Sequence, residues 1–410
     1  MAQKSKWTFM VYLAGDNNLQ EYGTIDLEEM KKVGSSPDLS LVAQFDCMSD
    51  QATRRYHLTA NHTLDADCVA TLPETNTGDP QVLIDFITWA CTTYPADHYA
   101  LILWNHGAGW KDDDIYRIAR DRGLADEIPR GQIRGLSSGR VSRALFSTTV
   151  EQMAEEATRR AILFDDSAAD FLDNIEMKRA LQQAAPAFNG QLDLLGFDAC
   201  LMSMLEVHYQ LRDTCQVVVG SQEVEPGDGW PYDDVLLSLA ADPTLTPEAL
   251  GRAIVDAYVD WYRATYPSLD VTQSAISLSG IEPVAAATTD LADVLKRSLS
   301  ATRTLGLLFK ALRSAQTFTD RDYVDVAHFC GLLAESDEEG AIGARARAVV
   351  ERLAGASSPV IAEAHHGTMV KDAAGLSLYL PTRILSPLYS GLDFALEHHW
   401  DDFLADFVAS

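Results

Sequence analysis

The sequence is short of basic residues. It has 32 Lys and Arg against 60 Asp and Glu, so its 410 residues carry a formal net charge of -28. Nucleic acids and anionic membranes bind positively charged surfaces, and we therefore expect neither as a partner. A negative surface would attract basic peptides, although solubility alone would also account for the charge.

Cysteines and long apolar runs are also scarce. The six cysteines are dispersed, and their spacing matches neither a disulfide framework nor a zinc site: Cys47, Cys68, Cys91, Cys200, Cys215 and Cys330. No apolar run approaches the roughly 20 residues that a membrane-spanning helix needs. Residues 1–7 lead directly into a predicted strand and leave no room for a signal peptide. We expect a cytoplasmic protein.

Most of the chain alternates predicted strands and helices. Strands are expected at 7–13, 39–47, 54–59 (an edge strand), 99–104, 161–164, 192–198, 216–221 and 271–278. Helices are expected at 19–33, 81–94, 175–185, 232–239, 247–266 and, in several pieces, 282–353. Residues 360–364 and 376–380 suggest a closing strand pair, and residues 392–407 a terminal helix. This order predicts an α/β fold with a mostly parallel sheet and right-handed crossovers.

One predicted strand leads into a cysteine. Residues 192–198 form an apolar run, and the residues after Cys200 follow helical spacing: Leu201, Met204, Leu205, His208 and Leu211. The pattern predicts a strand, a tight turn at Cys200 and a helix whose dipole would lower the pKa of the thiol. Asp198 and Cys200 are two residues apart and should share a strand face. Open α/β sheets place their active sites at such strand ends.

A second predicted strand leads into a histidine. Residues 99–104 are followed by Asn105, His106, Gly107, Ala108 and Gly109. If this strand is a parallel neighbour of the cysteine strand, His106 and Cys200 would meet at the same sheet edge as base and nucleophile. Taken separately, a strand-end cysteine and a lone histidine are more often structural residues.

The two motifs carry a family resemblance. Residues 104–110 (WNHGAGW) and 196–203 (GFDACLMS) resemble the histidine and cysteine motifs of the clostripain family of cysteine peptidases, in the caspase-like clan. Further similar stretches are 10–19, 219–223, 226–230, 322–325 and 375–381, so the resemblance extends from near residue 7 to near residue 407. It implies a caspase- or haemoglobinase-like three-layer α/β/α sandwich with an α-rich C-terminal extension. We expect a catalytic domain at 1–240 and a mostly helical region at 241–410.

The resemblance also implies a Cys200–His106 dyad that needs no third residue. The thiolate would attack a peptide carbonyl, and the backbone N–H groups of Gly107 and Cys200 would hold the oxyanion. Two other functions would fit the same residues: a catalytically silent interaction protein that keeps the fold, and a thiol acyl transferase or ligase. The Asp16–Asn18 turn could ligate calcium, but turn formation explains it equally well, and we expect no metal or cofactor.

Substrate specificity is expected from acidic residues near Cys200. The resemblance places the aspartate that recognises P1, the residue before the cut, at Asp198, where a carboxylate can bind a guanidinium or ammonium group. Asp228 and Trp230, from the loop after the next strand, are further pocket candidates, and Trp104 and Trp110 lie beside the motifs. Asp198 could instead complement the helix dipole, Asp228 could be a turn residue, and the tryptophans could be core. The prediction is cleavage after Arg, with Lys weaker.

Residues 111–160 interrupt the alternation. The segment is rich in arginine and glycine, and a surface loop of this length is usually functional or disordered. In the family it resembles, this segment holds sites of activating self-cleavage after basic residues. We therefore expect a zymogen cut at Arg130, Arg134, Arg140 or Arg143, with an upstream protease and a role in an intracellular signalling or defence cascade. The alternative is a solvated insertion without processing.

Overall fold

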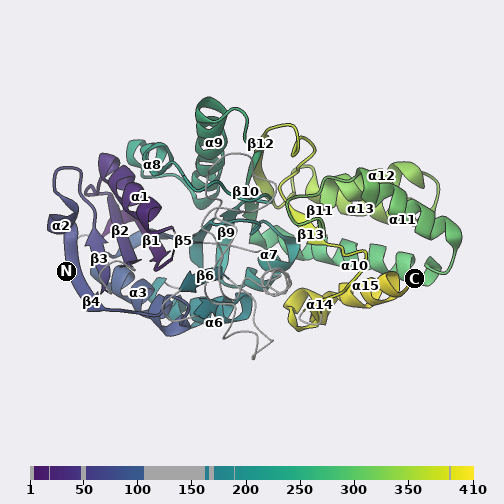
Figure 1. Ribbon diagram of the computed structural model, residues 1–410, viewed down its shortest axis with the longest axis horizontal. Helices are drawn as coiled ribbons and strands as arrows, with labels where there is room; N and C mark the ends of the chain where they lie inside the picture. Colours follow the sequence, from purple (N-terminus) through teal and green to yellow (C-terminus); the bar gives the residue numbers. More distant parts are fainter. Residues whose placement is uncertain are drawn as a thin grey trace, which may run out of the picture.

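A central nine-stranded sheet organises the chain in the computed structural model (Figure 1), which describes residues 4–17, 19–47, 52–105, 162–165, 170–188, 190–386 and 389–410. The strand order is β12-β10-β9-β8-β5-β1-β2-β3-β4. The bounds are β1 Ser5–Gly15, β2 Leu39–Cys47, β3 Ala52–His57, β4 Cys68–Pro73, β5 Ala96–Trp104, β8 Leu192–Asp198, β9 Cys215–Gly220, β10 Val271–Ser277 and β12 Val360–His366.

The middle of the sheet is parallel. Strands β2, β1, β5, β8 and β9 pair in parallel with one another, whereas β3 and β10 pair antiparallel with their neighbours. Every residue of β8 is buried, as expected for a parallel strand covered on both faces. The predicted mostly parallel α/β sheet is confirmed. The predicted edge strand is β3, but β4, which was not predicted, pairs with it and forms the actual edge.

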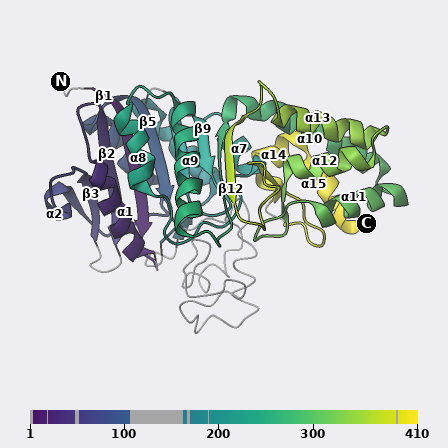
Figure 2. The same ribbon diagram turned by 90° about the horizontal axis from the view of Figure 1, so that it is seen from above.

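Helices cover both faces of the sheet (Figures 1 and 2). One face carries α1 Gln20–Val33, α8 Tyr232–Ala241 and α9 Pro247–Thr265, and the other carries α3 Pro80–Thr93, α6 Asn174–Ala184, α7 Leu205–Leu211 and α10 Ile281–Ser298. Side chains alternate along each strand, so one apolar core forms on each face: Leu103 and Phe197 belong to one, Trp104 and Leu194 to the other. The result is a three-layer α/β/α sandwich.

The C-terminal part is mainly helical but also completes the sheet. It contains α11 Thr302–Ser314, α12 Val326–Ser336, α13 Ala341–Leu353, α14 Asp393–His398 and α15 Trp400–Ala409, with a small sheet of β11 Tyr323–Asp325 and β13 Ser377–Tyr379. Strands β10 and β12 also come from beyond residue 240. The shorter elements are α2 Leu64–Asp67, β6 Ile162–Asp165, β7 Asp170–Leu172 and the 3-10 turns Ala185–Phe188, Leu278–Gly280 and Tyr389–Gly391. Across the described ranges, no helix is both long and apolar enough to cross a membrane.

Two of the predictions for the C-terminal part are wrong. The segments expected to form a closing pair do not pair with each other, because β12 joins the main sheet beside β10 and β13 pairs with β11. The terminal helix is divided at His399, whose φ of 54° interrupts the helical backbone between α14 and α15. Both errors concern long-range pairing or local backbone geometry, which apolar spacing does not encode.

Candidate active site

The strands that precede the two predicted catalytic residues are parallel neighbours. β5 pairs with β8, and the register places Trp104 opposite Asp198. The backbone N–H of Asn105 donates to the Asp198 carbonyl oxygen at 3.4 Å, which extends the pairing one step beyond the strands. Cys200 lies two residues after Asp198 at the carboxyl edge of β8, and in the sequence His106 lies two residues after Trp104. His106 itself lies outside the described residues.

Cys200 occupies a turn that directly follows β8. Its side chain is buried, and its Sγ accepts a hydrogen bond from the backbone N–H of Glu225 at 3.1 Å. Leu201 adopts a φ of 62°, a left-handed conformation that a non-glycine residue rarely takes, and its N–H donates to the Glu223 carbonyl oxygen at 3.2 Å. The thiol is therefore held between the β8 turn and the loop that follows β9.

The helix after Cys200 begins later than predicted. α7 begins at Leu205, residues 202–203 are not helical, and Met204 is extended. The Ser203 N–H donates to the Ser221 carbonyl oxygen at 2.9 Å, and Met204 forms a bridge with Ser377. These tertiary bonds override helical spacing at Leu201 and Met204. Cys200 is consequently not at the first turn of the helix, and the expected dipole effect on its pKa loses its basis, since such effects fade within one turn.

Asp198 lies on the sheet face covered by α8 and α9. Its side chain is fully buried, and one carboxylate oxygen accepts a hydrogen bond from the Tyr232 hydroxyl at 2.9 Å. Trp230 packs beside it: a Cβ added to Gly196, two residues before Asp198, would lie 2.7 Å from Trp230 Cη2. Trp230 therefore packs near the end of β8 that carries Asp198, and a shared role of the two residues in a P1 pocket stays a prediction.

Asp228 is only partly buried. It belongs to the turn closed by the Gly229 N–H, which donates to the Pro226 carbonyl oxygen at 3.0 Å. Trp104 is a core residue whose indole donates to the buried carboxylate of Asp26 on α1.

The first turn of the chain contacts the histidine segment. Asn17 donates from its side chain to the Ala14 carbonyl oxygen at 2.8 Å and to Asn105 Oδ1 at 3.1 Å. Asp16, the residue considered for calcium, is buried beside it. In the part of the chain that the structure describes, no cluster of three or more His, Cys, Asp or Glu side chains could hold a metal ion.

Comparison with known proteins identifies the family of the chain. The model of the clostripain family matches residues 11–127 and 150–407. The chain belongs to the clostripain family. Clostripain of Hathewaya histolytica is 29% identical over 310 residues, which are 63% of this chain and 50% of that protein, so the chain spans about half the length of this relative.

Solved structures of the family share the fold. A secreted C11 cysteine protease from Bacteroides thetaiotaomicron, bound to an irreversible peptide inhibitor, matches 98% of this chain and 99% of its own at 20% identity, with a TM-score of 0.64. An inactive zymogen C11 protease from Parabacteroides distasonis matches 97% and 99% at 18% identity, with a TM-score of 0.65. The expected caspase-like fold is confirmed.

Several predicted residues of this clostripain-family chain lie outside the described residues. These are His106, Gly107, Trp110 and the four candidate processing sites Arg130, Arg134, Arg140 and Arg143. Conversely, sequence reasoning missed Glu225, whose peptide group contacts the thiol, and Tyr232, which binds Asp198. Glu225 lies in the loop after β9 and Tyr232 just after it, and this loop was expected to line the site. Sequence spacing does not show which residues of the loop contact Cys200 or Asp198.

A buried acid and a buried histidine lie on α7 behind the cysteine turn. Glu206 Oε1 accepts from the Tyr379 backbone N–H and the Tyr389 hydroxyl, both at 2.9 Å, and burial raises the pKa of Glu206 to about 7. Burial lowers the pKa of His208 to about 3, and neither of its ring nitrogens has a hydrogen-bond partner among the described residues. Glu206 therefore joins the helix after the cysteine turn to the C-terminal part.

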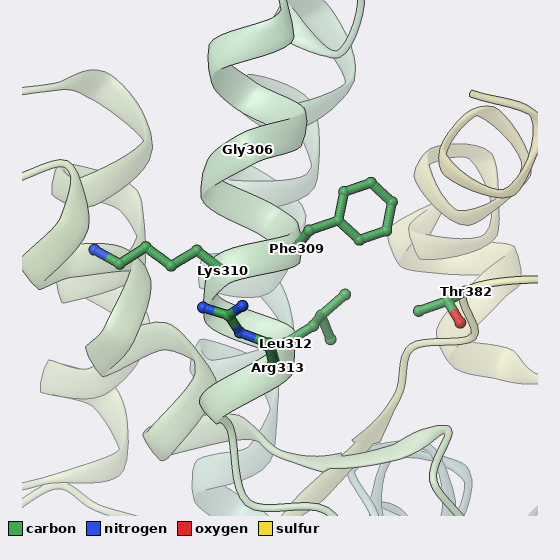
Figure 3. Close-up of a pocket in the computed structure, with 6 residues that line it drawn as sticks. All are labelled: Gly306, Phe309, Lys310, Leu312, Arg313 and Thr382. Atoms are coloured by element: carbon green, nitrogen blue, oxygen red, sulfur yellow. The ribbon is translucent and has the colours of Figure 1, made fainter.

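A surface pocket lies away from the strand ends (Figure 3). It is lined by residues of α11 and by Thr382, which follows β13: Gly306, Phe309, Lys310, Leu312, Arg313 and Thr382. Phe309 and Leu312 point toward Thr382, whereas Lys310 points away. None of the predicted catalytic or specificity residues lines this pocket.

Proposed function

We propose that this chain is a cysteine endopeptidase that cleaves after arginine, and more weakly after lysine, with Cys200 as nucleophile and His106 as general base and acid. The observation that carries the proposal is the β5–β8 register, which matches Trp104 with Asp198. This register supports the proposal that the residues two positions later share one sheet edge, where a thiol and an imidazole could act on the same peptide bond.

The mechanism follows from these two groups. Imidazole takes the thiol proton, and the thiolate attacks the peptide carbonyl carbon to form a tetrahedral intermediate. The imidazolium then protonates the leaving amine as the C–N bond breaks, which leaves a thioester on Cys200. Water, deprotonated by the imidazole, hydrolyses the thioester and returns the thiol. We expect the N–H groups of Gly107 and Cys200 to stabilise the oxyanion.

Basic P1 specificity is proposed from Asp198. A carboxylate two residues before the nucleophile, on the buried side of the strand end, can bind a cationic side chain placed next to the scissile bond. Its bond from Tyr232 at 2.9 Å fixes the orientation of the carboxylate without neutralising its charge. Asp228 and Trp230 remain proposed members of the same pocket.

Activation by cleavage within residues 111–160 is part of the proposal. The candidate sites are Arg130, Arg134, Arg140 and Arg143, and a relative with the same fold has an inactive zymogen form. A protease specific for single arginines would damage a cell if it were always active, which favours a cytoplasmic zymogen in a signalling or defence cascade. We propose that neither calcium nor another cofactor is required.

The test compares the chain with its Cys200→Ala and His106→Ala variants on fluorogenic peptides that end in Arg, Lys, Asp or Leu. We expect cleavage after Arg, weaker cleavage after Lys and loss of both in the two variants. A gel and a mass spectrum of each sample follow the integrity of residues 111–160. Failure of an arginine-directed thiol inhibitor to label Cys200 would favour an interaction protein, and amide transfer to an added amine would favour an acyl transferase.

A further inference from the structure

Four buried polar side chains gather on the sheet face that α8 and α9 cover, near the end of β8. They are Asp198 at the end of β8, Glu225 in the loop after β9, Tyr258 on α9 and Gln273 on β10, and each is 0% exposed. We call them the buried polar cluster. Gln273 shares its strand face with Val271 and Ala275, which belong to the apolar core under α8 and α9, as does Tyr258. All of the cluster therefore lies on the Asp198 side of the sheet.

Direct contacts connect the cluster to the nucleophile. Gln273 Nε2 donates to Glu225 Oε1 at 3.2 Å, and the backbone N–H of the same Glu225 donates to Cys200 Sγ at 3.1 Å. The pKa of Tyr258 is raised well above its usual value, first by burial and then by the negative charges of Glu225, Asp198 and Cys200 among others. The Tyr258 hydroxyl is thus within electrostatic range of both carboxylates and the thiol.

Polar atoms in and beside the cluster lack hydrogen-bond partners within the described ranges. They are the Tyr258 hydroxyl, Gln273 Oε1 and, next to the cluster, Trp230 Nε1. A buried polar atom without a hydrogen bond destabilises the fold, so such atoms usually face a ligand or an ordered water. Because Gln273 uses its amide N–H on Glu225, the atom it leaves available is an acceptor.

The cluster is therefore rich in acceptors and in negative charge. It combines two carboxylates, an amide oxygen and a hydroxyl oxygen in a buried region. Carboxylates in a buried region attract a cationic group. An arginine guanidinium offers five N–H donors in a planar fork, whereas a lysine ammonium offers three around a single point.

We propose that Glu225 and Gln273 are specificity-determining residues of the P1 pocket and that they make the enzyme prefer arginine over lysine. This inference rests on the proposed function, because it assumes that Asp198 receives a basic P1 side chain. Asp198 alone would accept either cation. The Glu225 carboxylate and the Gln273 amide oxygen supply the further acceptors that only the forked guanidinium can engage at the same time.

The test measures kcat/KM on two peptides that differ only in P1, Arg or Lys. Glu225→Gln keeps the shape of the side chain and removes its charge, and Gln273→Met keeps the length and removes the acceptor. We expect Glu225→Gln to reduce kcat/KM for the Arg peptide by about 10- to 100-fold and for the Lys peptide much less. The Arg/Lys ratio should fall about fivefold or more, and Gln273→Met should lower the same ratio by a smaller factor.

Glu206→Gln is the matched control, because Glu206 is equally buried but bonds to Tyr379 and Tyr389 on α7's side of the molecule. It should leave the Arg/Lys ratio unchanged. Thermal unfolding and iodoacetamide labelling of Cys200 show whether each variant is folded with an accessible thiol. An unchanged ratio in folded Glu225→Gln and Gln273→Met, or an equal loss on both peptides, would overturn the inference. If the wild-type enzyme cleaves neither peptide, the proposed function itself fails, independently of the variants.

Discussion

Asn17 and Asn105 are joined by a side-chain hydrogen bond of 3.1 Å that links the first turn of the chain to the residue before His106. Both side chains are buried, and Asn17 Oδ1 also accepts from the Leu19 N–H at 2.9 Å. The bond fixes the end of β5 from the neighbouring strand. Asn17 is therefore a positioning residue for the segment that carries the imidazole.

Asn17→Asp should lower kcat/KM by about tenfold, since small displacements of catalytic groups have large effects on rate. The aspartate keeps the acceptor for Leu19 but cannot donate to Asn105. We expect the pH profile of kcat/KM to change while iodoacetamide labelling of Cys200 remains possible. Asn61→Ala, at an exposed asparagine, is the control. A purely structural role would lower the melting temperature and leave the pH profile as it is.

Glu206→Gln should make the protein more stable at alkaline pH. The Glu206 carboxyl has a pKa of about 7 in the folded chain and 4.5 ordinarily, so the folded state holds a proton that the unfolded state has lost. Stability therefore falls as pH rises from about 4.5 through 7, by about 3 kcal/mol at most. Glutamine keeps the acceptor for Tyr379 and Tyr389 and removes this loss. Urea unfolding at pH 5 and pH 8 measures it, and equal differences from wild type at both pH values would contradict the explanation.

His208→Leu should make the protein less sensitive to unfolding at acidic pH. Burial lowers the pKa of His208 from 6.5 to about 3. Below pH 6.5 the unfolded chain therefore binds a proton at His208, whereas the folded chain binds it only near pH 3. Stability is lost as pH falls from 6.5 toward 3, by about 2 kcal/mol at pH 5. Leucine removes the titrating group, and the variant should lose less stability than wild type between pH 7 and pH 5. Urea unfolding at pH 7 and pH 5 measures this loss, and an equal loss of unfolding free energy in wild type and His208→Leu would refute the prediction.

Gly196→Ala should disturb the support of Asp198. The new Cβ would lie 2.5 Å from Ile102 Cδ1 and 2.7 Å from Trp230 Cη2, so the indole must shift, at a cost of about 1–3 kcal/mol. We expect a lower melting temperature and a higher KM for basic peptides. Gly306→Ala on α11 is the control, because its Cβ meets nothing within 4 Å and should stabilise the helix by about 0.5–1 kcal/mol. A KM unchanged in Gly196→Ala would mean that Trp230 does not shape the pocket.

The parallel pairing of the two motif strands was accessible from sequence because each apolar run ends in a polar residue suited to a sheet edge. β5 and β8 are indeed neighbours, Asp198 ends β8, and Trp230 packs against Gly196 two residues earlier. These features depend on local patterns repeated at strand ends. The prediction of a cysteine peptidase came from the two family motifs, because apolar spacing alone predicts only the strands and helices.

The contacts around the thiol were not accessible in the same way. Glu225 reaches Cys200 through a backbone group, and Gln273 reaches Glu225 from a strand 48 residues later. α7 begins later than the sequence predicts because Ser203 and Met204 bond to distant segments and do not join the helix. Such contacts depend on how separate loops pack, and residue type at one position does not reveal them.

β10 pairs with β9 but follows it by about 50 residues in the sequence, and this order matters during synthesis. Strand β9 obtains its second neighbour only from residues 271–277, so a nascent or truncated chain that stops earlier presents an unprotected row of N–H and C=O groups beside an apolar face. Such an intermediate invites intermolecular pairing before the polypeptide is complete. Attempts to trim this protein to an N-terminal fragment that lacks β10 should therefore yield inclusion bodies, whereas in the longer chain β10 covers the exposed side of β9.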